Sequence, residues 1–488
     1  MKRISITLLG VLFCLSLSGQ TDQFTSNLYE TYDSYREPTL DKRRVKHENL
    51  QPLIDTIGAK PGFEVRTVGR SIEGRALRLI SLGTGDTDVF LWSQMHGNEP
   101  TATQAIFDIL NLMASPDFQE EKEEILKSVR LHFLPMLNPD GAAVYKRRNT
   151  LSIDINRDAL RLQSPEGRTL KRVRDSLEAE FGFNLHDQST YYNAERTPKP
   201  ATISYLAPAY NYEKDINSVR ANAMKVIGFM NQIIQNYAPG QVGKYNDDFE
   251  PRAFGDNIQK WGTSAILIES GGYPGDVEKQ EIRKLNYVSI LSAIYAIATG
   301  AYEDIPLEAY NQIPENDRKL FDLKIEKVTY PLMGSDYTID IGIQRPEVNA
   351  EEYEAFWNSS RIIDIGDLST YYGYQSMDAS QHRLTWGKVY PETLEDLKSA
   401  EELDFWDLLS KGIAYVRVKR LPGDLTWSPS PVHLVSETFK IPQGPLDIGD
   451  NPTFFLEKAG KPQYAIINGF LYHIPTREGK GHNSMVFR

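Results

Sequence analysis

A histidine and a glutamate stand three positions apart where an apolar run gives way to a proline. His96 and Glu99 belong to the stretch LWSQMHGNEP, between a predicted buried strand and a predicted helix that begins near Pro100. Gly97 lets the backbone bend tightly between them, so an imidazole and a carboxylate can converge on one metal ion. The H-x-x-E pattern is weak by itself, because two solvated polar residues would look the same in a sequence.

Two further polar residues stand at the ends of apolar runs later in the chain. His186 follows FGFNL and Glu269 follows SAILI. Ligands bind at the carboxyl ends of strands in open α/β sheets, so His186 can join the first pair there. Two histidines and one carboxylate leave the fourth position of a tetrahedral zinc ion for water, which is typical of a hydrolytic site, and Glu269 could serve as its general base. The alternatives are a histidine bonded to backbone and an ordinary loop acid.

Four residues that could bind an anion lie in the stretch YKRRNTLSIDINRDAL. They are Arg147, Arg148, Asn156 and Arg157. A guanidinium group binds a carboxylate in bidentate fashion, and one placed beside a metal can stabilise a tetrahedral oxyanion. The stretch therefore offers a binding site for an acidic group of a substrate, although an exposed basic strand edge would have the same composition.

The elements that must position these residues are short apolar strands that alternate with helices. Runs such as DVFLWSQM and FGFNLHD alternate with helical segments such as PTATQAIFDILNLMAS up to about residue 303. This alternation predicts an α/β domain over residues 21–303, in which helices cover both faces of a mixed sheet. Over residues 304–488, short alternating segments separated by Gly, Pro and Asp predict a smaller β-rich domain.

The N-terminal residues and the composition limit where the protein could be located and what it could bind. Residues 1–20 combine Lys2 and Arg3 with a short apolar stretch, which predicts a signal peptide and an exported protein, periplasmic or extracellular. No later run reaches the ~18 apolar residues of a membrane span. The formal net charge of -12 argues against nucleic acid as a partner. Cys14 is the only cysteine and lies in the predicted signal, so a metal must be bound by His, Asp or Glu.

The order of His96, Glu99, NPDG, DINRD, His186 and Glu269 resembles that of the carboxypeptidase A-like zinc metallocarboxypeptidases, here as a bacterial exported member. The resemblance covers about residues 45–303. It implies that His96, Glu99 and His186 bind one Zn2+ ion. It also implies that Glu269 acts as general base on a zinc-activated water and then as proton donor to the leaving amine.

The same resemblance implies roles for the anion-binding residues. Asn156 and Arg157 would bind the terminal carboxylate of the substrate, which would be a peptide with a free C-terminus. Arg147 most closely matches the arginine that polarises the scissile carbonyl, with Arg148 as a near rival. We therefore expect Arg147 to belong to the catalytic group.

The sequence says less about the pocket that would bind the side chain of the substrate. The segment around Gly255 and Asp256 matches the floor of that pocket in the family. Arg252 nearby would favour an acidic substrate residue, whereas Asp256 would favour a basic one, and both remain open.

Some positions depart from the family pattern or lack a clear role. The family carries a mobile tyrosine some twenty residues before the catalytic glutamate; Tyr245 is close, but residues 247–249 read Asp, Asp, Phe. The loop after the second histidine is rich in tyrosine, and Tyr191, Tyr192 and Tyr205 are candidate substrate contacts there. Aromatic packing beneath the loop is the alternative.

The leading hypothesis is an exported zinc carboxypeptidase that removes residues from the carboxyl ends of peptides. One alternative is a peptidoglycan stem-peptide carboxypeptidase or amidase, and another is a non-catalytic binding protein on the same fold. The C-terminal domain could contact the cell wall or a glycan. The natural substrate and the oligomeric state stay open, as does the question whether the residues before Asn49 form a pro-segment.

Overall fold

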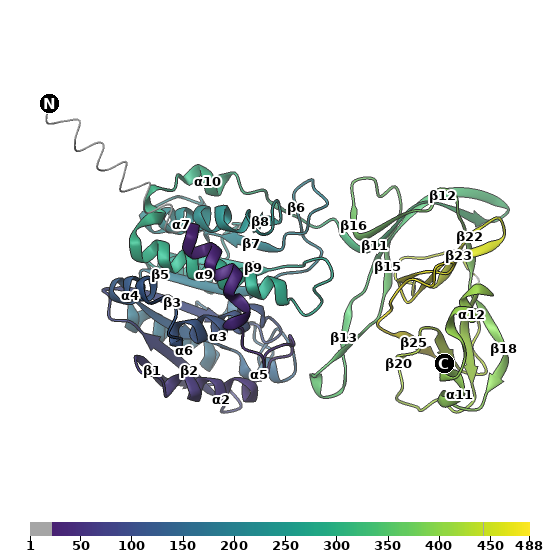
Figure 1. Ribbon diagram of the computed structural model, residues 1–488, viewed down its shortest axis with the longest axis horizontal. Coiled ribbons are helices and arrows are strands. Elements are labelled where there is room, and N and C mark those ends of the chain that lie inside the picture. The colour runs from purple at the N-terminus through teal and green to yellow at the C-terminus, as the bar shows by residue number, and fades with distance from the viewer. Residues whose placement is uncertain (1–21, 443) are drawn as a thin grey trace. The chain divides into compact units, whose positions relative to one another are not determined.

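The computed structural model describes residues 22–442 and 444–488, so the expected signal peptide lies outside the described residues. The chain divides into two compact units between Arg318 and Lys319 (Figure 1). The sequence pattern placed the change at residue 303. The helix η3 (Ala301–Asp304) spans that position, and the residues beyond it form α10 (Leu307–Asn311) and β10 (Asn316–Asp317). Strand β10 pairs with β6 (Asn193–Ala194) in the first unit.

The first unit is built on one eight-stranded mixed sheet with the order β1-β2-β4-β3-β5-β9-β7-β8. The neighbours β4, β3, β5 and β9 run parallel, whereas β2 is antiparallel to β4 and β7 is antiparallel to β9. The strands are β1 (Phe63–Arg70), β2 (Ala76–Leu82), β3 (Thr87–Ser93), β4 (Val129–Leu134), β5 (Phe181–Asp187), β7 (Ile203–Leu206), β8 (Val242–Lys244) and β9 (Ser264–Ser270).

The central parallel strands are buried on both faces. All seven residues of β9 are buried, and in β3 only Thr87 is partly exposed. A strand covered on both sides needs apolar residues at successive positions rather than at alternate ones. This requirement explains the continuous apolar runs of the sequence.

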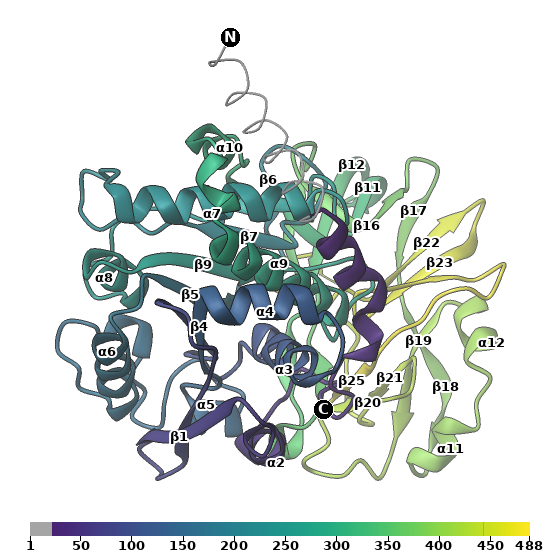
Figure 2. The same ribbon diagram turned by 60° about the vertical axis from the view of Figure 1, so that its left-hand side comes forward.

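Helices cover both faces of the sheet, as the sequence predicted. On one face α3 (Thr101–Ala114), α4 (Gln119–Ser128) and α7 (Ser218–Ile234) all pack against α9 (Gln280–Thr299), and α2 (His47–Gly58) adds to the same apolar core (Figure 2). On the other face α6 (Pro165–Leu177) and α8 (Phe254–Lys260) enclose a second core with Phe90 and Trp92 of β3. Two short helices, α5 (Pro139–Ala143) and η2 (Ile155–Arg157), lie between β4 and α6 in the chain.

The segment before α2 is part of the core of the first unit. Phe24, Leu28 and Leu40 are almost fully buried in the apolar cluster that contains α3 and α9. The side chains of Asp108 in α3 and Arg283 in α9 form a completely buried ion pair, and Arg283 also donates to the backbone oxygen of Glu37 at 3.0 Å. Residues 22–46 therefore pack as an integral element of the unit, which includes η1 (Tyr32–Ser34).

The second unit is β-rich, as expected. One sheet has the order β15-β12-β11-β17-β22-β23-β24 with β16 beside β11, and a five-stranded sheet has the order β18-β19-β21-β25-β20. The strands of the first sheet are β11 (Leu320–Leu332), β12 (Ser335–Gln344), β15 (Arg361–Gly366), β16 (Tyr372–Asp378), β17 (Arg383–Trp386), β22 (Phe454–Lys458), β23 (Lys461–Ile467) and β24 (Phe470–His473). The other elements are β13 (Glu347–Asn349), η4 (Glu351–Tyr353), β14 (Phe356–Asn358), β18 (Lys388–Leu394), α11 (Leu397–Glu401), α12 (Phe405–Ser410), β19 (Ile413–Val418), β20 (Trp427–Ser428), β21 (His433–Val435) and β25 (Ser484–Phe487).

Within the described residues, no helix combines the length and the apolar character needed to cross a membrane.

Candidate active site

Three neighbouring parallel strands bring the expected site residues to one edge of the sheet. His96 follows β3 by three residues, His186 lies near the end of β5, and Glu269 lies near the end of β9. His186 and Glu269 are register partners, and β3 pairs with β5 up to Ser93. The carboxyl ends of parallel strands meet at the same edge, so residues far apart in the sequence converge there.

His96, Glu99 and His186 form a compact group of three potential metal ligands. Nδ1 of His96 lies 3.1 Å from Nδ1 of His186, and Oε2 of Glu99 lies 2.8 Å from each of these nitrogens. All three residues are buried. A tetrahedral zinc ion with bonds of about 2.0–2.2 Å sets its ligand atoms roughly 3.3–3.6 Å apart, so a small outward shift would fit the group to zinc.

The outer nitrogen of one histidine is held by a carboxylate. Nε2 of His96 lies 3.2 Å from Oδ1 of Asp154, and Arg147 binds the other oxygen of Asp154 through Nε at 3.1 Å. Such a partner fixes the orientation of a ligating imidazole and raises its basicity. Nε2 of His186 is buried without a hydrogen-bond partner among the described residues. Both imidazoles thus direct Nδ1 toward the same point as Glu99.

A close backbone contact shapes the loop between β3 and α3. A Cβ atom on Gly97 would lie 2.1 Å from the carbonyl carbon of Gly141 and 2.2 Å from the nitrogen of Ala142. The opposing chain is the NPDG turn, where Asn138 caps α5 by accepting from the nitrogen of Gly141 at 2.9 Å. The glycine between the two ligands is therefore required by packing, and the NPDG motif forms the surface on which it packs.

The structure distinguishes the two adjacent arginines. Nη1 of Arg147 lies 3.2 Å from Oε1 of Glu99 and 3.0 Å from Nδ1 of His96. Arg148 is exposed and donates to the backbone oxygen of Ser152 at 2.9 Å. Only the guanidinium group of Arg147 reaches the potential ligands.

Glu269 occupies an environment that favours its protonated form. Burial raises the pKa of its carboxyl well above the ordinary value, and the nearby charges of Glu99 and Asp187 raise it further. Arg147 and Lys279 act in the opposite direction, and a cation bound by the three ligands would also lower this pKa. A carboxyl group beside the potential ligands is placed to act as a general base.

Asn156 and Arg157 contact the start of α8 and the segment before it. Oδ1 of Asn156 accepts from the nitrogen of Phe254 at 2.9 Å, and the nitrogen of Ala159 donates to the oxygen of Arg252 at 3.1 Å. Arg157 is exposed, and its Nε lies 3.4 Å from Oε2 of Glu250. The expected carboxylate-binding pair therefore lies at the surface beside residues 250–254.

Arg252 and Asp256 both contact Glu250. Arg252 binds Glu250 in bidentate fashion, at 3.0 Å through Nε and 2.9 Å through Nη2. Oδ1 of Asp256 accepts from the nitrogen of Glu250 at 3.0 Å. Burial raises the pKa of Asp256 to about 6.

Tyr205 does not meet the expectation of a substrate contact. Its side chain is completely buried in the core, and its hydroxyl group lies 2.7 Å from Oγ of Ser289 in α9. The residue belongs to β7, a strand that the sequence pattern did not separate from the preceding loop. Tyr205 therefore has no exposed surface for a substrate.

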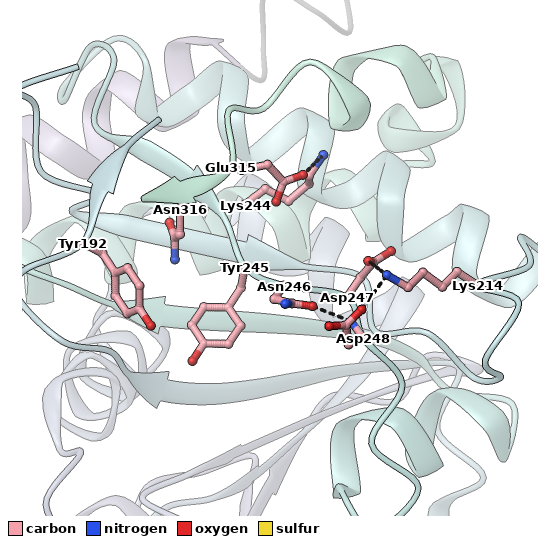
Figure 3. A pocket seen from close by; sticks show the side chains of 9 residues that line it. All are labelled: Tyr192, Lys214, Lys244, Tyr245, Asn246, Asp247, Asp248, Glu315 and Asn316. Carbon is pink, nitrogen blue, oxygen red and sulfur yellow. Dashed lines mark hydrogen bonds and ion pairs between the residues drawn. The ribbon is translucent and has the colours of Figure 1, made fainter. Parts of the chain in front are cut away.

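Tyr192 and Tyr245 instead line a cavity of about 570 Å³ (Figure 3). Their ring centroids are 6.2 Å apart in an edge-to-face arrangement. Burial raises the pKa of Tyr245, and the charge of Glu269 is the next cause, which places this tyrosine near the expected catalytic glutamate. The other lining residues are Lys214, Lys244, Asn246, Asp247, Asp248, Glu315 and Asn316.

Two residues of this region were not singled out by sequence reasoning. Asp154 was visible as the acidic residue of DINRD, and its position two residues before Asn156 was a usable signal. Glu250 gave no such signal, because its contact with Arg157 depends on the approach of η2 to the segment before α8.

A group of two histidines and one carboxylate at the edge of an open α/β sheet is a donor set that could hold a zinc ion, and a buried glutamate lies beside it. Residues 52–186 match the model of the Peptidase M14 family, described as zinc carboxypeptidase. This part of the chain is therefore similar to the zinc carboxypeptidases of that family.

Individual relatives agree with the family match. Carboxypeptidase SOL1 of Arabidopsis thaliana is 26% identical over 177 residues, which are 30% of this chain and 35% of the relative. Carboxypeptidase E of Caenorhabditis elegans is 30% identical over 112 residues, which are 19% and 24% of the two chains. The chain thus spans about a quarter to a third of the length of these curated relatives.

Solved structures of similar proteins include a metallo-carboxypeptidase from Burkholderia cenocepacia. It has 17% identity and a TM-score of 0.43, and the match covers 52% of this chain and 69% of that one. Carboxypeptidase A from Helicoverpa armigera has 15% identity and a TM-score of 0.42, with 58% and 81% covered.

Proposed function

We propose that the first unit is a zinc-dependent metallocarboxypeptidase that hydrolyses the C-terminal residues of peptides. The observation that carries this proposal is the convergence of Nδ1 of His96, Nδ1 of His186 and Oε2 of Glu99 within 2.8–3.1 Å, with Glu269 as register partner of His186. The family match over residues 52–186 supports the same activity.

His96, Glu99 and His186 would hold one zinc ion. When bound, zinc acts as a Lewis acid on a carbonyl group and lowers the pKa of water. Glu269 would take the proton of the attacking water and transfer it to the nitrogen of the leaving amine. Its place as register partner of His186 supports this role, because it puts the carboxyl group beside the potential ligands.

Arg147 would stabilise the negative charge that develops on the carbonyl oxygen. Its guanidinium group lies at the ligands Glu99 and His96, where a scissile carbonyl would have to approach. Its position is held through Asp154, which it binds at 3.1 Å.

Asn156 and Arg157 would bind the terminal carboxylate of the peptide. Arg157 supplies an exposed guanidinium group, and the backbone beside it is fixed by the hydrogen bonds of Asn156 and Ala159 with the segment before α8. Because this contact requires a charged carboxylate at the end of the substrate, we expect the enzyme to act only on peptides with a free C-terminus.

Export remains a proposal that rests on residues 1–20 of the sequence. The domain limits 21–303 and 304–488 are likewise proposed from the sequence. The two compact units divide the chain between Arg318 and Lys319. We propose that the β-rich second unit is an accessory to the catalytic one.

The activity can be tested with zinc-loaded protein and a panel of paired peptides. Each peptide would carry either a free C-terminus or its amide, and a peptidoglycan stem peptide would test the main alternative. Glu269→Gln serves as the matched variant, because it keeps the shape of the side chain and removes the base. We expect cleavage of the free peptides only, and a rate about 10²–10⁴-fold lower in the variant.

Other outcomes would redirect the proposal. Cleavage of the stem peptide alone would favour the cell-wall alternative. If zinc binds but neither linear nor stem peptides are cleaved, the carboxypeptidase proposal is wrong and a binding function takes its place.

A further inference from the structure

Arg157, the proposed partner of the substrate carboxylate, already contacts a carboxylate of this chain. Its Nε lies 3.4 Å from Oε2 of Glu250, and its Nη1 donates to the backbone oxygen of Asn156 at 2.7 Å. Glu250 is in turn bound by Arg252 through two hydrogen bonds of 3.0 and 2.9 Å. The three side chains form a surface chain in which one carboxylate lies between two guanidinium groups.

The position of Glu250 is set by its own backbone and needs no substrate. Its nitrogen donates to Oδ1 of Asp256 at 3.0 Å, and its oxygen accepts from the nitrogen of Ala253 at 2.8 Å. The nitrogen of Arg252 adds a third hydrogen bond, to Oε1 of Glu250 at 3.1 Å. These contacts fix the turn before α8, so the carboxylate is presented to Arg157 by a rigid segment.

Glu250 carries the same chemical group as the end of a peptide. The hydrogen bond from Arg252 is the main cause that lowers the pKa of Glu250, so the carboxylate is charged at neutral pH. A substrate carboxylate that approaches Arg157 would meet a second negative charge on the same guanidinium group. Like charges on one site repel, so the two carboxylates cannot bind with full strength together.

The two ion pairs of Glu250 are unequal. The contact with Arg252 is bidentate and at hydrogen-bond distance, whereas the contact with Arg157 is a single approach at 3.4 Å. The side chains of Arg157, Glu250 and Arg252 are 37%, 30% and 58% exposed, so solvent weakens both pairs. A substrate can therefore displace Glu250 from Arg157 while Arg252 retains it.

We propose that Glu250 is a specificity-determining residue that competes with the substrate carboxylate for Arg157, and that Arg252 sets the strength of this competition by holding Glu250. The inference rests on the proposed carboxypeptidase function of the same site. It assigns Arg252 a role toward Glu250 instead of a direct contact with an acidic substrate side chain.

The proposal predicts effects of opposite sign for the two partners of one ion pair. Glu250→Gln removes the competing charge, so KM for peptides with free C-termini should fall about 3-fold to 10-fold. Arg252→Gln releases Glu250 to Arg157, so KM should rise by a similar factor. The double variant should resemble Glu250→Gln, because Arg252 acts only through Glu250.

Steady-state kinetics on a free C-terminal peptide would test these signs, with Glu213→Gln as a matched control. Glu213 is an exposed glutamate of the same unit, so the control measures the loss of one surface charge by itself. We expect the changes in KM and not in kcat, and an unchanged KM in the control. An unchanged or higher KM in Glu250→Gln, or equal effects of both single variants, would overturn the proposal.

Binding measurements separate this inference from the proposed function. Calorimetric titration of the zinc-loaded wild type and Glu250→Gln with the released amino acid and with its amide reports the carboxylate site without turnover. Tighter binding of the free amino acid in the variant supports the competition. Equal binding in both proteins overturns the inference alone. No preference for the acid over the amide in either protein would show that Arg157 is no carboxylate site, and both proposals would fail.

Discussion

His186 and Glu269 lie directly opposite each other in the neighbouring parallel strands β5 and β9. On its other side Glu269 is the register partner of Ser204 in β7. The distance between a potential metal ligand and the proposed general base is therefore fixed by the backbone ladder of the sheet, not by a loop. Strands hold such groups more rigidly than loops do, which suits a site in which geometry decides the rate.

Removal of a ligand should abolish tight zinc binding. His186→Ala takes one of the three converging atoms away, and two ligands do not hold zinc with useful affinity. Metal content after dialysis, measured by atomic absorption, should fall from about one zinc ion per chain to nearly none. His473→Ala in the second unit is the control and should keep its zinc, and a variant of His186 that retained full zinc would contradict the assignment.

The carboxylate behind His96 should tune metal affinity without binding the metal itself. Asp154→Asn weakens the contact at 3.2 Å with Nε2 of His96, and loss of such a partner lowers metal affinity about 10-fold to 100-fold. Competition with a chelator of known affinity would measure the change. An unchanged affinity would mean that the orientation of His96 is set by packing alone.

Gly97 should not tolerate a side chain. In Gly97→Ala the new Cβ would lie 2.1–2.2 Å from backbone atoms of Gly141 and Ala142, so one of the two segments must shift. Overpacking of this kind costs about 1–3 kcal/mol, and the shift would also move the ligands on either side. Thermal unfolding and zinc affinity should both decline. Gly423→Ala, where nothing lies within 4 Å of the added Cβ, is the matched control and should change neither.

Asp256 should make stability depend on pH in the weakly acidic range. Burial raises its pKa from 3.8 to about 6, so between these values the folded state binds a proton that the unfolded state lacks. Stability should therefore rise as the pH falls from about 6 to about 4, by about 1–3 kcal/mol from this group. In Asp256→Asn that part of the dependence should vanish, while the amide oxygen can still accept from the nitrogen of Glu250. The difference in melting temperature between metal-free wild type and variant, followed across this range, measures the effect, and a constant difference would refute it.

The buried pair of Asp108 and Arg283 should be essential for the N-terminal segment. Asp108→Asn leaves the guanidinium group of Arg283 buried without its charge partner, which costs about 3–5 kcal/mol. The free energy of unfolding should fall by this amount, and residues near Glu37 should become sensitive to proteolysis because Arg283 holds their backbone. Asp175→Asn removes the exposed partner of two ion pairs at the surface and should cost less than about 1 kcal/mol.

The integration of the N-terminal segment leads to an expectation about a possible pro-segment. A pro-segment that is cleaved away has to separate from the enzyme without exposing its core. Phe24, Leu28 and Leu40 are instead buried among the helices of one face of the sheet. We therefore expect that a variant without residues 22–46 will not fold, and recovery of soluble protein would contradict this.

The sequence by itself determined the sheet, its two helical layers and the potential metal group. These features are local in origin, since a strand buried on both faces needs a continuous apolar run, and a polar residue at the end of such a run marks the edge of the sheet. His96, Glu99, His186 and Glu269 were therefore found without knowledge of their contacts.

Only the tertiary structure decided which neighbours of these residues contribute to the site. Arg147 and Arg148 are adjacent in the sequence, but the turn of the chain brings only Arg147 to the ligands. Tyr205 was a candidate substrate contact and is instead buried against Ser289, because a tyrosine at the end of a loop and one in a short core strand look alike in a sequence. The carboxylate of Glu250 meets Arg157 across more than ninety intervening residues, and no local pattern encodes such a contact.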